Sequence, residues 1–132
     1  MSSYFTTDEL ACPCCKACLL APHFLDALNA LRDACGHPLQ INSACRCTAH
    51  NKAVGGKSGS FHLMDRKPAS GPLGTCAADV STTGWDAVKK WRFIKIAMGM
   101  GWSVGFAKTF IHIDTRHKFP DSGWANPVFF TY

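Results

Sequence analysis

The sequence lacks the features that would place it in a membrane, in a fibre or among disordered chains. No stretch of its 132 residues approaches the ~20 apolar residues that a membrane helix needs. There is no internal repeat and no low-complexity tract. A hydrophobic fraction of 47% with only 17% charged residues is typical of a globular protein. The length suits one modest core, so we expect residues 1–132 to form a single domain.

The N-terminus also lacks a basic start followed by an apolar segment, which predicts that it carries no ordinary secretory signal. The net charge of +5 would favour an anionic partner. The basic residues are scattered, however, with one short run at 89–92. We therefore expect neither nucleic acid nor a membrane to be the partner, and we expect a monomer.

Cysteine, in contrast, is abundant, and four of the eight cysteines lie within 12–18. In a small secreted chain this pattern indicates disulfides, and in a reducing compartment it indicates metal ligands or free thiols. The Cys12-x-x-Cys15 and Cys15-x-x-Cys18 spacings suit a zinc knuckle, which Cys45-x-Cys47 could complete. We favour disulfides that tie the N-terminal arm to the segment around Arg46. A structural zinc bound by these cysteines is the alternative, and free thiols are the third reading.

Hydrophobic periodicity and chain breakers predict two main helices and a small sheet. The first helix runs from about Pro22 to Cys35 and ends at Gly36. The second is capped by Thr82 or Thr83 and runs to about Met98. One side of it carries Val88, Trp91, Ile94 or Lys95, and Met98.

Period-2 patterns predict strands at 39–43, 77–81, 102–106 and 109–115. A short helical turn is expected at 51–56, a surface loop at 64–75, an irregular arm at 1–21 and an irregular tail at 118–132. The sum is an α+β domain, in which a small, mostly antiparallel sheet packs against two main helices.

The last predicted strand carries two polar side chains on one face. His112 and Asp114 are two residues apart, so they point the same way, and Phe110 shares their face. Ile111 and Ile113 point to the opposite, apolar side. This arrangement suits the wall of a site, and equally a histidine–aspartate pair on the surface.

Three further residues complete a possible metal site. His62 follows a Gly/Ser-rich loop, Asp79 lies in an apolar strand, and Arg46 follows the end of another strand. Two histidines and one carboxylate suit a catalytic zinc, which uses three protein ligands and leaves a fourth position for water. An arginine beside it could hold a peptide carboxylate bidentately while the metal polarises the neighbouring carbonyl.

These residues lie in motifs that follow one another in a fixed order along the chain. The motifs are Phe5–Cys12, Pro38–Cys47, His50–Gly56, Ser60-Phe61-His62-Leu63, Ala77-Ala78-Asp79-Val80 and Phe110-Ile111-His112-Ile113-Asp114. Their sequence resembles that of the zinc D-alanyl-D-alanine carboxypeptidase family. These peptidoglycan peptidases share their fold with the hedgehog signalling domain and include many phage and prophage lysis proteins.

The resemblance implies a role for each matching residue. It makes His62, Asp79 and His112 the zinc ligands. It makes Arg46 the residue that positions substrate through a carboxylate or carbonyl. Ser60 matches a serine beside the metal, and we count it with Arg46 among the substrate-binding candidates.

The sequence departs from the family between two of the implied ligands. The family places the histidine and the aspartate seven residues apart, whereas His62 and Asp79 are seventeen apart. Loop closure costs little more for a longer loop, so the ligands can still meet. We expect the insertion at 64–76 to lie over or beside the site. Asp65 within it is the alternative to Asp79 as ligand.

The second departure concerns the general base. Many members carry a carboxylate three residues before the last histidine, where this chain has Thr109, and others carry a histidine where it has Phe110. We therefore assign Asp114 as a catalytic candidate, which either acts as the base or holds His112 in its ligating tautomer. Weaker candidates are His117 and His50.

The leading hypothesis is zinc-dependent hydrolysis of peptide bonds in peptidoglycan stem peptides, by a D,D-carboxypeptidase or an endolysin-type endopeptidase. Such a protein would be made in the cytoplasm and act at the cell wall, in the periplasm or outside the cell. One alternative is a zinc-containing cell-wall-binding module with impaired catalysis. Another is a cysteine-rich zinc protein that contacts nucleic acid through residues 89–92, with salt-sensitive binding.

Overall fold

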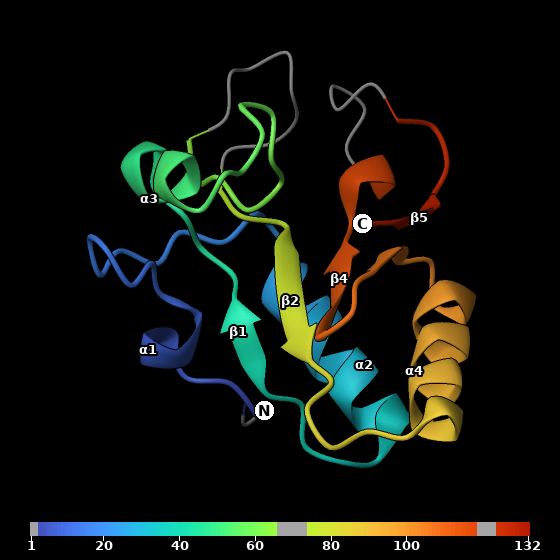
Figure 1. Cartoon of the computed structure of the whole chain (residues 1–132). Coiled ribbons are helices and arrows are strands. Elements are labelled where there is room, and N and C mark those ends of the chain that lie inside the picture. The colour runs from blue at the N-terminus through green and yellow to red at the C-terminus, as the bar shows by residue number, and fades with distance from the viewer. Residues whose placement is uncertain (1–2, 66–73, 119–123) are drawn as a thin grey trace.

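The computed structural model describes residues 3–65, 74–118 and 124–132. Within these residues, five strands form one sheet in the order β1-β2-β4-β3-β5, and two of the four α-helices are long (Figure 1). The strands are β1 (Ile41–Ser43), β2 (Ala77–Ser81), β3 (Ser103–Phe106), β4 (Phe110–Asp114) and β5 (Phe129–Thr131). The helices are α1 (Thr7–Leu10), α2 (Phe24–Cys35), α3 (Thr48–Ala53) and α4 (Ala87–Gly99), with a 3-10 turn at Arg116–Lys118. The predicted α+β class, a mostly antiparallel sheet with two main helices, is confirmed.

Helix α2 forms as its periodicity predicts. Phe24, Leu28 and Leu31 are buried on one side. Gly36 ends the helix in the left-handed region, at φ 74°, and its N–H donates to the carbonyl of Arg32. A glycine is favoured there because it has no Cβ to clash.

Helix α4 begins later than predicted and buries a different side. Its N-cap is Asp86, whose carboxylate accepts from the N–H of Lys89 at 2.8 Å, so the prediction of Thr82 or Thr83 as cap is wrong. Thr82 is instead tied to the adjacent strand connection, because its N–H donates to the carbonyl of Thr109. Phe93 and Ala97 are the buried residues of the helix. The stripe named from the sequence is largely exposed: Val88, Trp91 and Met98 are 56%, 59% and 47% exposed.

The two faces of the sheet have different characters. Ala78, Val80, Val104, Ile111 and Ile113 belong to the main hydrophobic core together with residues of α2 and α4, and α2 passes behind the sheet in Figure 1. Alternation along β2 and β4 therefore directs the intervening side chains to the other face. The register pairs Asp79 with His112 across these strands. The strand pairing thus sets two implied ligands opposite each other.

The predicted irregular arm and tail each contain a regular element. The arm includes α1, where Thr6 and Glu9 form a reciprocal capping box. The tail contributes β5, which pairs in parallel with β3 at the edge of the sheet. This three-residue strand has no long alternating pattern, and its partner is distant in sequence, so the tail reads as irregular from sequence alone. The short helix α3 also differs from its prediction: it begins at Thr48, before the expected turn at 51–56, and the side chain of Cys47 caps it.

Candidate metal centre

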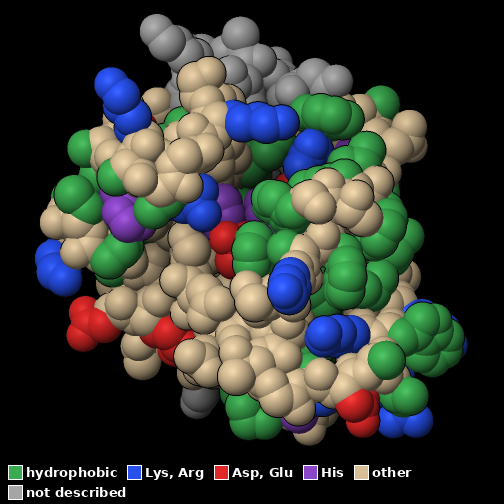
Figure 2. Space-filling model, viewed as in Figure 1, with side chains coloured by type: hydrophobic (Ala, Val, Ile, Leu, Met, Phe, Trp, Pro, Cys, Tyr) green, Lys and Arg blue, Asp and Glu red, His purple; other side chains and the backbone are tan. Residues whose placement is uncertain are grey.

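Three side chains from separate parts of the chain converge on the polar face of the sheet. Nε2 of His62 and Nδ1 of His112 each lie 3.1 Å from Oδ1 of Asp79. One ligand atom from each residue lies within 4.8 Å of the others, and all three residues are buried. Asp79 and His112 come from paired strands, and His62 from the connection between α3 and β2. Figure 2 shows histidine and acidic side chains recessed near the middle of this face.

Each histidine is held by a partner on the ring nitrogen that faces away from Asp79. Nδ1 of His62 donates to the carbonyl of Ala44 at 2.8 Å. Nε2 of His112 donates to Oδ2 of Asp114 at 2.7 Å. With the far nitrogens occupied in this way, the nitrogen of each ring that faces Asp79 is the one a metal would bind after losing its proton. Two neutral nitrogens and a carboxylate oxygen within 4.8 Å fit the donor set of a catalytic zinc.

The electrostatics of this group are strongly coupled. Burial raises the pKa of Asp79, but hydrogen bonds to His112 and His62 outweigh it and hold the pKa below its usual range. Burial dominates at His62 and lowers its pKa. At His112, burial is outweighed by the hydrogen bonds to Asp114 and Asp79, which raise the pKa. The same carboxylate therefore faces one imidazole whose pKa is lowered and another whose pKa is raised.

Asp114 is itself held by an arginine that sequence reasoning missed. The backbone N–H of Arg116 donates to Oδ1 of Asp114 at 3.0 Å, and its guanidinium donates to Oδ1 and Oδ2 at 2.7–3.1 Å. The guanidinium carbon lies 4.7 Å from the ring centroids of both Phe61 and Trp124. Arg116 continues the two-residue alternation beyond His112 and Asp114, and that spacing was the one signal that could have revealed it.

Arg46 is bound to the metal-site carboxylate. Its Nη2 donates to Oδ2 of Asp79 at 3.2 Å, its Nε to Ser43 at 3.1 Å, and its Nη1 to Oδ1 of Asn51 at 3.3 Å. Asn51 is buried and also donates to the carbonyl of Lys57 at 2.9 Å. A role for Asn51 was not foreseen, although it lies in one of the family-like motifs.

Ser60 and Thr75 position the backbone around His62. The hydroxyl of Ser60 accepts from the N–H of His62 at 3.2 Å, and the hydroxyl of Thr75 donates to the carbonyl of His62 at 2.7 Å. The main chain of Arg46 runs alongside, because its N–H donates to the same His62 carbonyl at 2.9 Å. Ser60 is thus beside the centre, as the resemblance implies, and Thr75 is a further support that sequence reasoning missed.

The remaining candidates lie around this centre. Asp65, the alternative ligand, is exposed and accepts from Thr48 at 3.5 Å. Thr109, which stands where many family members carry the base, lies in the turn before β4. His117 lies in the 3-10 turn Arg116–Lys118, and burial lowers its pKa. Most of the insertion at 64–76 lies outside the described residues. Its two described ends meet, since the N–H of Gly74 donates to the carbonyl of Met64 at 2.7 Å.

Aromatic rings of the C-terminal segment cover one side of His112. The ring centroid of Phe130 lies 5.6 Å from that of His112, and the centroid of Tyr132 lies 6.5 Å from it. Gly105 pairs with His112 in the sheet, and a Cβ at Gly105 would lie only 2.4 Å from the Phe130 ring. The absence of a side chain at Gly105 is therefore what lets Phe130 approach the centre.

Comparison with protein families matches residues 3–114 to the family described as Peptidase M15. The chain belongs to the peptidase M15 family. The match includes Arg46 and all three implied ligands, and it confirms the resemblance to the zinc D-Ala-D-Ala carboxypeptidases. Family membership supports a metallopeptidase, and the M15 peptidases are zinc enzymes. A search of curated proteins found no match to the chain.

The cysteines of this M15 peptidase differ from the sequence expectation. All eight, each of them within the described residues, are free thiols, so the structure contains none of the disulfides that the sequence favoured. Cys12, Cys15 and Cys47 lie with their sulfur atoms within 4.8 Å of one another. The N-terminal arm is therefore brought to the segment beside Arg46, as expected, but as a cluster of thiols.

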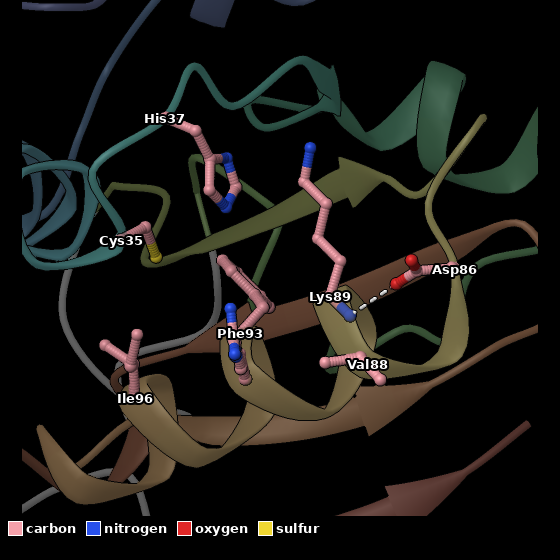
Figure 3. Close-up of a pocket in the computed structure, with 8 residues that line it drawn as sticks. Cys35, His37, Asp86, Val88, Lys89, Phe93 and Ile96 are labelled. Atoms are coloured by element: carbon pink, nitrogen blue, oxygen red, sulfur yellow. Dashed lines mark hydrogen bonds between the residues drawn. The ribbon is translucent and has the colours of Figure 1, made fainter.

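A separate pocket of about 300 Å³ lies between the end of α2 and the start of α4 (Figure 3). Its residues are Cys35, His37, Asp86, Val88, Lys89, Arg92, Phe93 and Ile96. None belongs to the candidate metal centre. Burial raises the pKa of Cys35 to about 11, so this thiol stays protonated. No helix among the described residues is long and apolar enough to cross a bilayer.

Proposed function

We propose that this M15 peptidase hydrolyses peptide bonds in peptidoglycan stem peptides with zinc at His62, Asp79 and His112. The observation that carries the proposal is the convergence of Nε2 of His62, Oδ1 of Asp79 and Nδ1 of His112 within 4.8 Å. Both imidazoles are anchored on their far nitrogens, so the donor set is oriented before an ion arrives. When bound, zinc supplies a Lewis acid that polarises a carbonyl and lowers the pKa of water.

Arg46 is suited to hold the substrate beside this centre. A guanidinium has five N–H donors, and the contacts with Ser43, Asn51 and Asp79 use three of them. The two others can bind a carboxylate or carbonyl of the peptide, and the side chain is 14% exposed. The contact with Asp79 fixes the guanidinium next to the ligand set, so a bound peptide would be oriented toward it.

We assign Asp114 the second of its two suggested roles, as a positioning residue. It contacts the nitrogen of His112 that faces away from Asp79, and Arg116 engages both of its oxygens. In that place it sets the tautomer of His112 rather than receiving a proton from water on the metal side. This leaves the usual carboxylate base of the family without a counterpart at Thr109.

The position of Asp114 also favours a second candidate function. A domain that retains the zinc ligands and Arg46 but lacks a base could bind stem peptides without cutting them. In either case we propose that the protein acts as a monomer where peptidoglycan lies, at the wall, in the periplasm or outside the cell. Neither nucleic acid nor a membrane is the proposed partner.

The test is incubation of the purified zinc-loaded protein with defined muramyl peptides, followed by mass spectrometry of the products. A carboxypeptidase releases terminal D-alanine, and an endopeptidase cuts within the stem. We expect His62→Ala to abolish cleavage. The matched control is His37→Ala, which removes a histidine of the separate pocket and should cleave as the unmodified chain does.

The outcomes separate the two candidates. Cleavage that depends on His62 supports the peptidase. Zinc at the histidine centre with peptide binding but no cleavage supports the binding module. Zinc-loaded protein that neither binds nor cleaves muramyl peptides would overturn both.

A further inference from the structure

A second group of metal-ligating side chains lies outside the proposed peptidase centre. Cys12 and Cys15 come from the N-terminal arm, and Cys47 comes from the residue before α3. Their sulfur atoms lie within 4.8 Å of one another. The group within 4.8 Å consists of Cys12, Cys15 and Cys47, and the thiol of Cys14 interacts with that of Cys47 beside it. Cys12 is buried, whereas Cys14 and Cys15 are exposed, which leaves the group open to an ion from solvent.

The backbone of the arm is folded around the sulfur of Cys12. The N–H of Cys12 donates to the carbonyl of Ala17, and the N–H of Lys16 donates to the carbonyl of Cys12, both at 2.8 Å. This turn requires Lys16 to adopt φ 64°, a region that residues other than glycine rarely occupy. The two hydrogen bonds that close the turn hold the backbone in this costly conformation.

Backbone N–H groups point at the sulfur atoms from both segments. Cys14 and Cys15 donate to the sulfur of Cys12, as does Cys47 at 3.4 Å. The N–H of His50 donates to the sulfur of Cys47 at 3.4 Å, which makes this sulfur the N-cap of α3. Such donors stabilise negative charge on sulfur, which is the form that ligates metals.

We propose that Cys12, Cys15 and Cys47 bind a second, structural zinc ion and that Cys14, which lies between two of them in the chain, supplies the fourth thiolate. A closed set of four sulfur ligands, two of them in a Cys-x-x-Cys turn, is the donor set of structural zinc sites. A disulfide would join two of these sulfurs and leave the others beside it, whereas one ion uses all four. The pair Cys18 and Cys45, with sulfurs 3.8 Å apart, stands outside the site.

The proposed ion has a definite structural task. Cys47 directly follows Arg46, and it also caps the helix that contains Asn51, the partner of that arginine. An ion at this place would clip the N-terminal arm to the main-chain segment that positions Arg46. The inference stands independently of the proposed peptidase activity, because it concerns ligands that are distinct from His62, Asp79 and His112.

The test is the metal content of the reduced, full-length protein, measured by elemental analysis with and without a mercurial reagent that displaces metal from thiolates. We expect about two zinc ions per chain, one of them released by the mercurial. Cys12→Ser and Cys47→Ser should each lose that ion and keep the other. His62→Ala should keep the mercurial-sensitive ion and lose the other. Cys35→Ser is the matched control and should keep both.

A second measurement does not depend on the folding of any cysteine variant. The His62→Ala protein loaded with cobalt(II) should show a thiolate-to-metal charge-transfer band in the ultraviolet, which the mercurial abolishes. The proposal is overturned if zinc falls to none in His62→Ala, if the cobalt protein shows no such band, or if the mercurial-sensitive metal is iron. Peptide mapping that finds Cys12, Cys15 or Cys47 in disulfides in the zinc-loaded protein would also overturn it.

Discussion

Oδ2 of Asp114 lies 2.7 Å from Nε2 of His112, on the side of the imidazole that faces away from Asp79. This buried carboxylate also accepts hydrogen bonds from the backbone N–H and the guanidinium of Arg116. Arg116, Asp114 and His112 therefore form a line of hydrogen bonds that ends at the candidate metal centre. In such a line, the orientation of the imidazole depends on residues that do not contact the metal.

Replacement of Asp114 by asparagine should weaken zinc binding more than it impairs catalysis by the zinc-loaded protein. The amide is a weaker acceptor for His112, and Arg116 loses its ionic partner, so we expect a zinc affinity ~10- to 100-fold lower. Competition with a zinc chelator measures the affinity. Hydrolysis of muramyl peptides at saturating zinc should be largely restored.

The control for this variant is Asp26→Asn, which alters an exposed carboxylate on α2 and should leave zinc affinity unchanged. A normal zinc affinity in Asp114→Asn, together with a loss of hydrolysis that excess zinc does not restore, would instead show that Asp114 acts as the base.

The stability that His112 contributes should depend on pH in opposite directions with and without zinc. In the zinc-free protein, Asp114 and Asp79 raise the pKa of His112 above its ordinary 6.5. The folded state then binds more protons than the unfolded state. The contribution is therefore fully present below pH 6.5 and is lost as the pH rises through the raised pKa. Zinc requires the deprotonated ring, so in its presence the contribution grows with pH.

The measurement is the difference in unfolding free energy between the unmodified chain and His112→Asn, from urea titrations across this pH range. Taking the difference removes the contributions of other groups that titrate in the same pH range in both proteins. A zinc-free difference that rises with pH would show that His112 is neutral in the folded protein, and would contradict the prediction.

Arg46→Lys should impair peptide hydrolysis while leaving zinc bound. Lysine keeps the charge but loses the planar fork that contacts Ser43, Asn51 and Asp79 together. We expect kcat/KM to fall roughly 100-fold, because a misplaced substrate costs about that much. Steady-state kinetics with a defined stem peptide measure this ratio, and the matched control is Arg92→Lys, which alters an exposed arginine on α4. An unchanged kcat/KM would exclude Arg46 from substrate positioning.

The directions of two of the three candidate ligands were predictable because these residues lie in short strands with an alternating pattern, whereas His62 was found through the family resemblance. His112 alternates with Ile111 and Ile113, and Asp79 precedes Val80, so burial of the apolar side directs both polar side chains to the other face. The residues that sequence reasoning missed act through contacts that no local period encodes. Arg116 lies just beyond a strand end, where alternation has no apolar partner to confirm it.

The same distinction explains the errors in the fold. The stripe of Val88, Trp91 and Met98 has a helical period, but it is Phe93 and Ala97 that belong to the main hydrophobic core. A helical period shows that apolar residues share one face of the helix, but it does not show which of two apolar faces packs against the core. The parallel pairing of β5 with β3 is likewise a long-range contact of a three-residue strand.

Gly105→Ala should displace the aromatic wall beside His112. A Cβ at this position would lie 2.4 Å and 2.5 Å from two atoms of the Phe130 ring, so the ring must move away from His112. Overpacking of this kind costs about 1–3 kcal/mol. Urea denaturation should show this loss of stability, and the chemical shifts of the His112 ring protons should change.

Gly99→Ala is the matched control for this substitution. Gly99 is the last residue of α4, and a Cβ there meets nothing within 4 Å. Since alanine is the better helix former, this variant should be neutral or more stable by up to about 1 kcal/mol. The two variants add the same methyl group, so a difference between them measures the contact with Phe130. Equal stability of the two variants, with unshifted His112 ring protons, would show that Phe130 does not lie against Gly105 in solution.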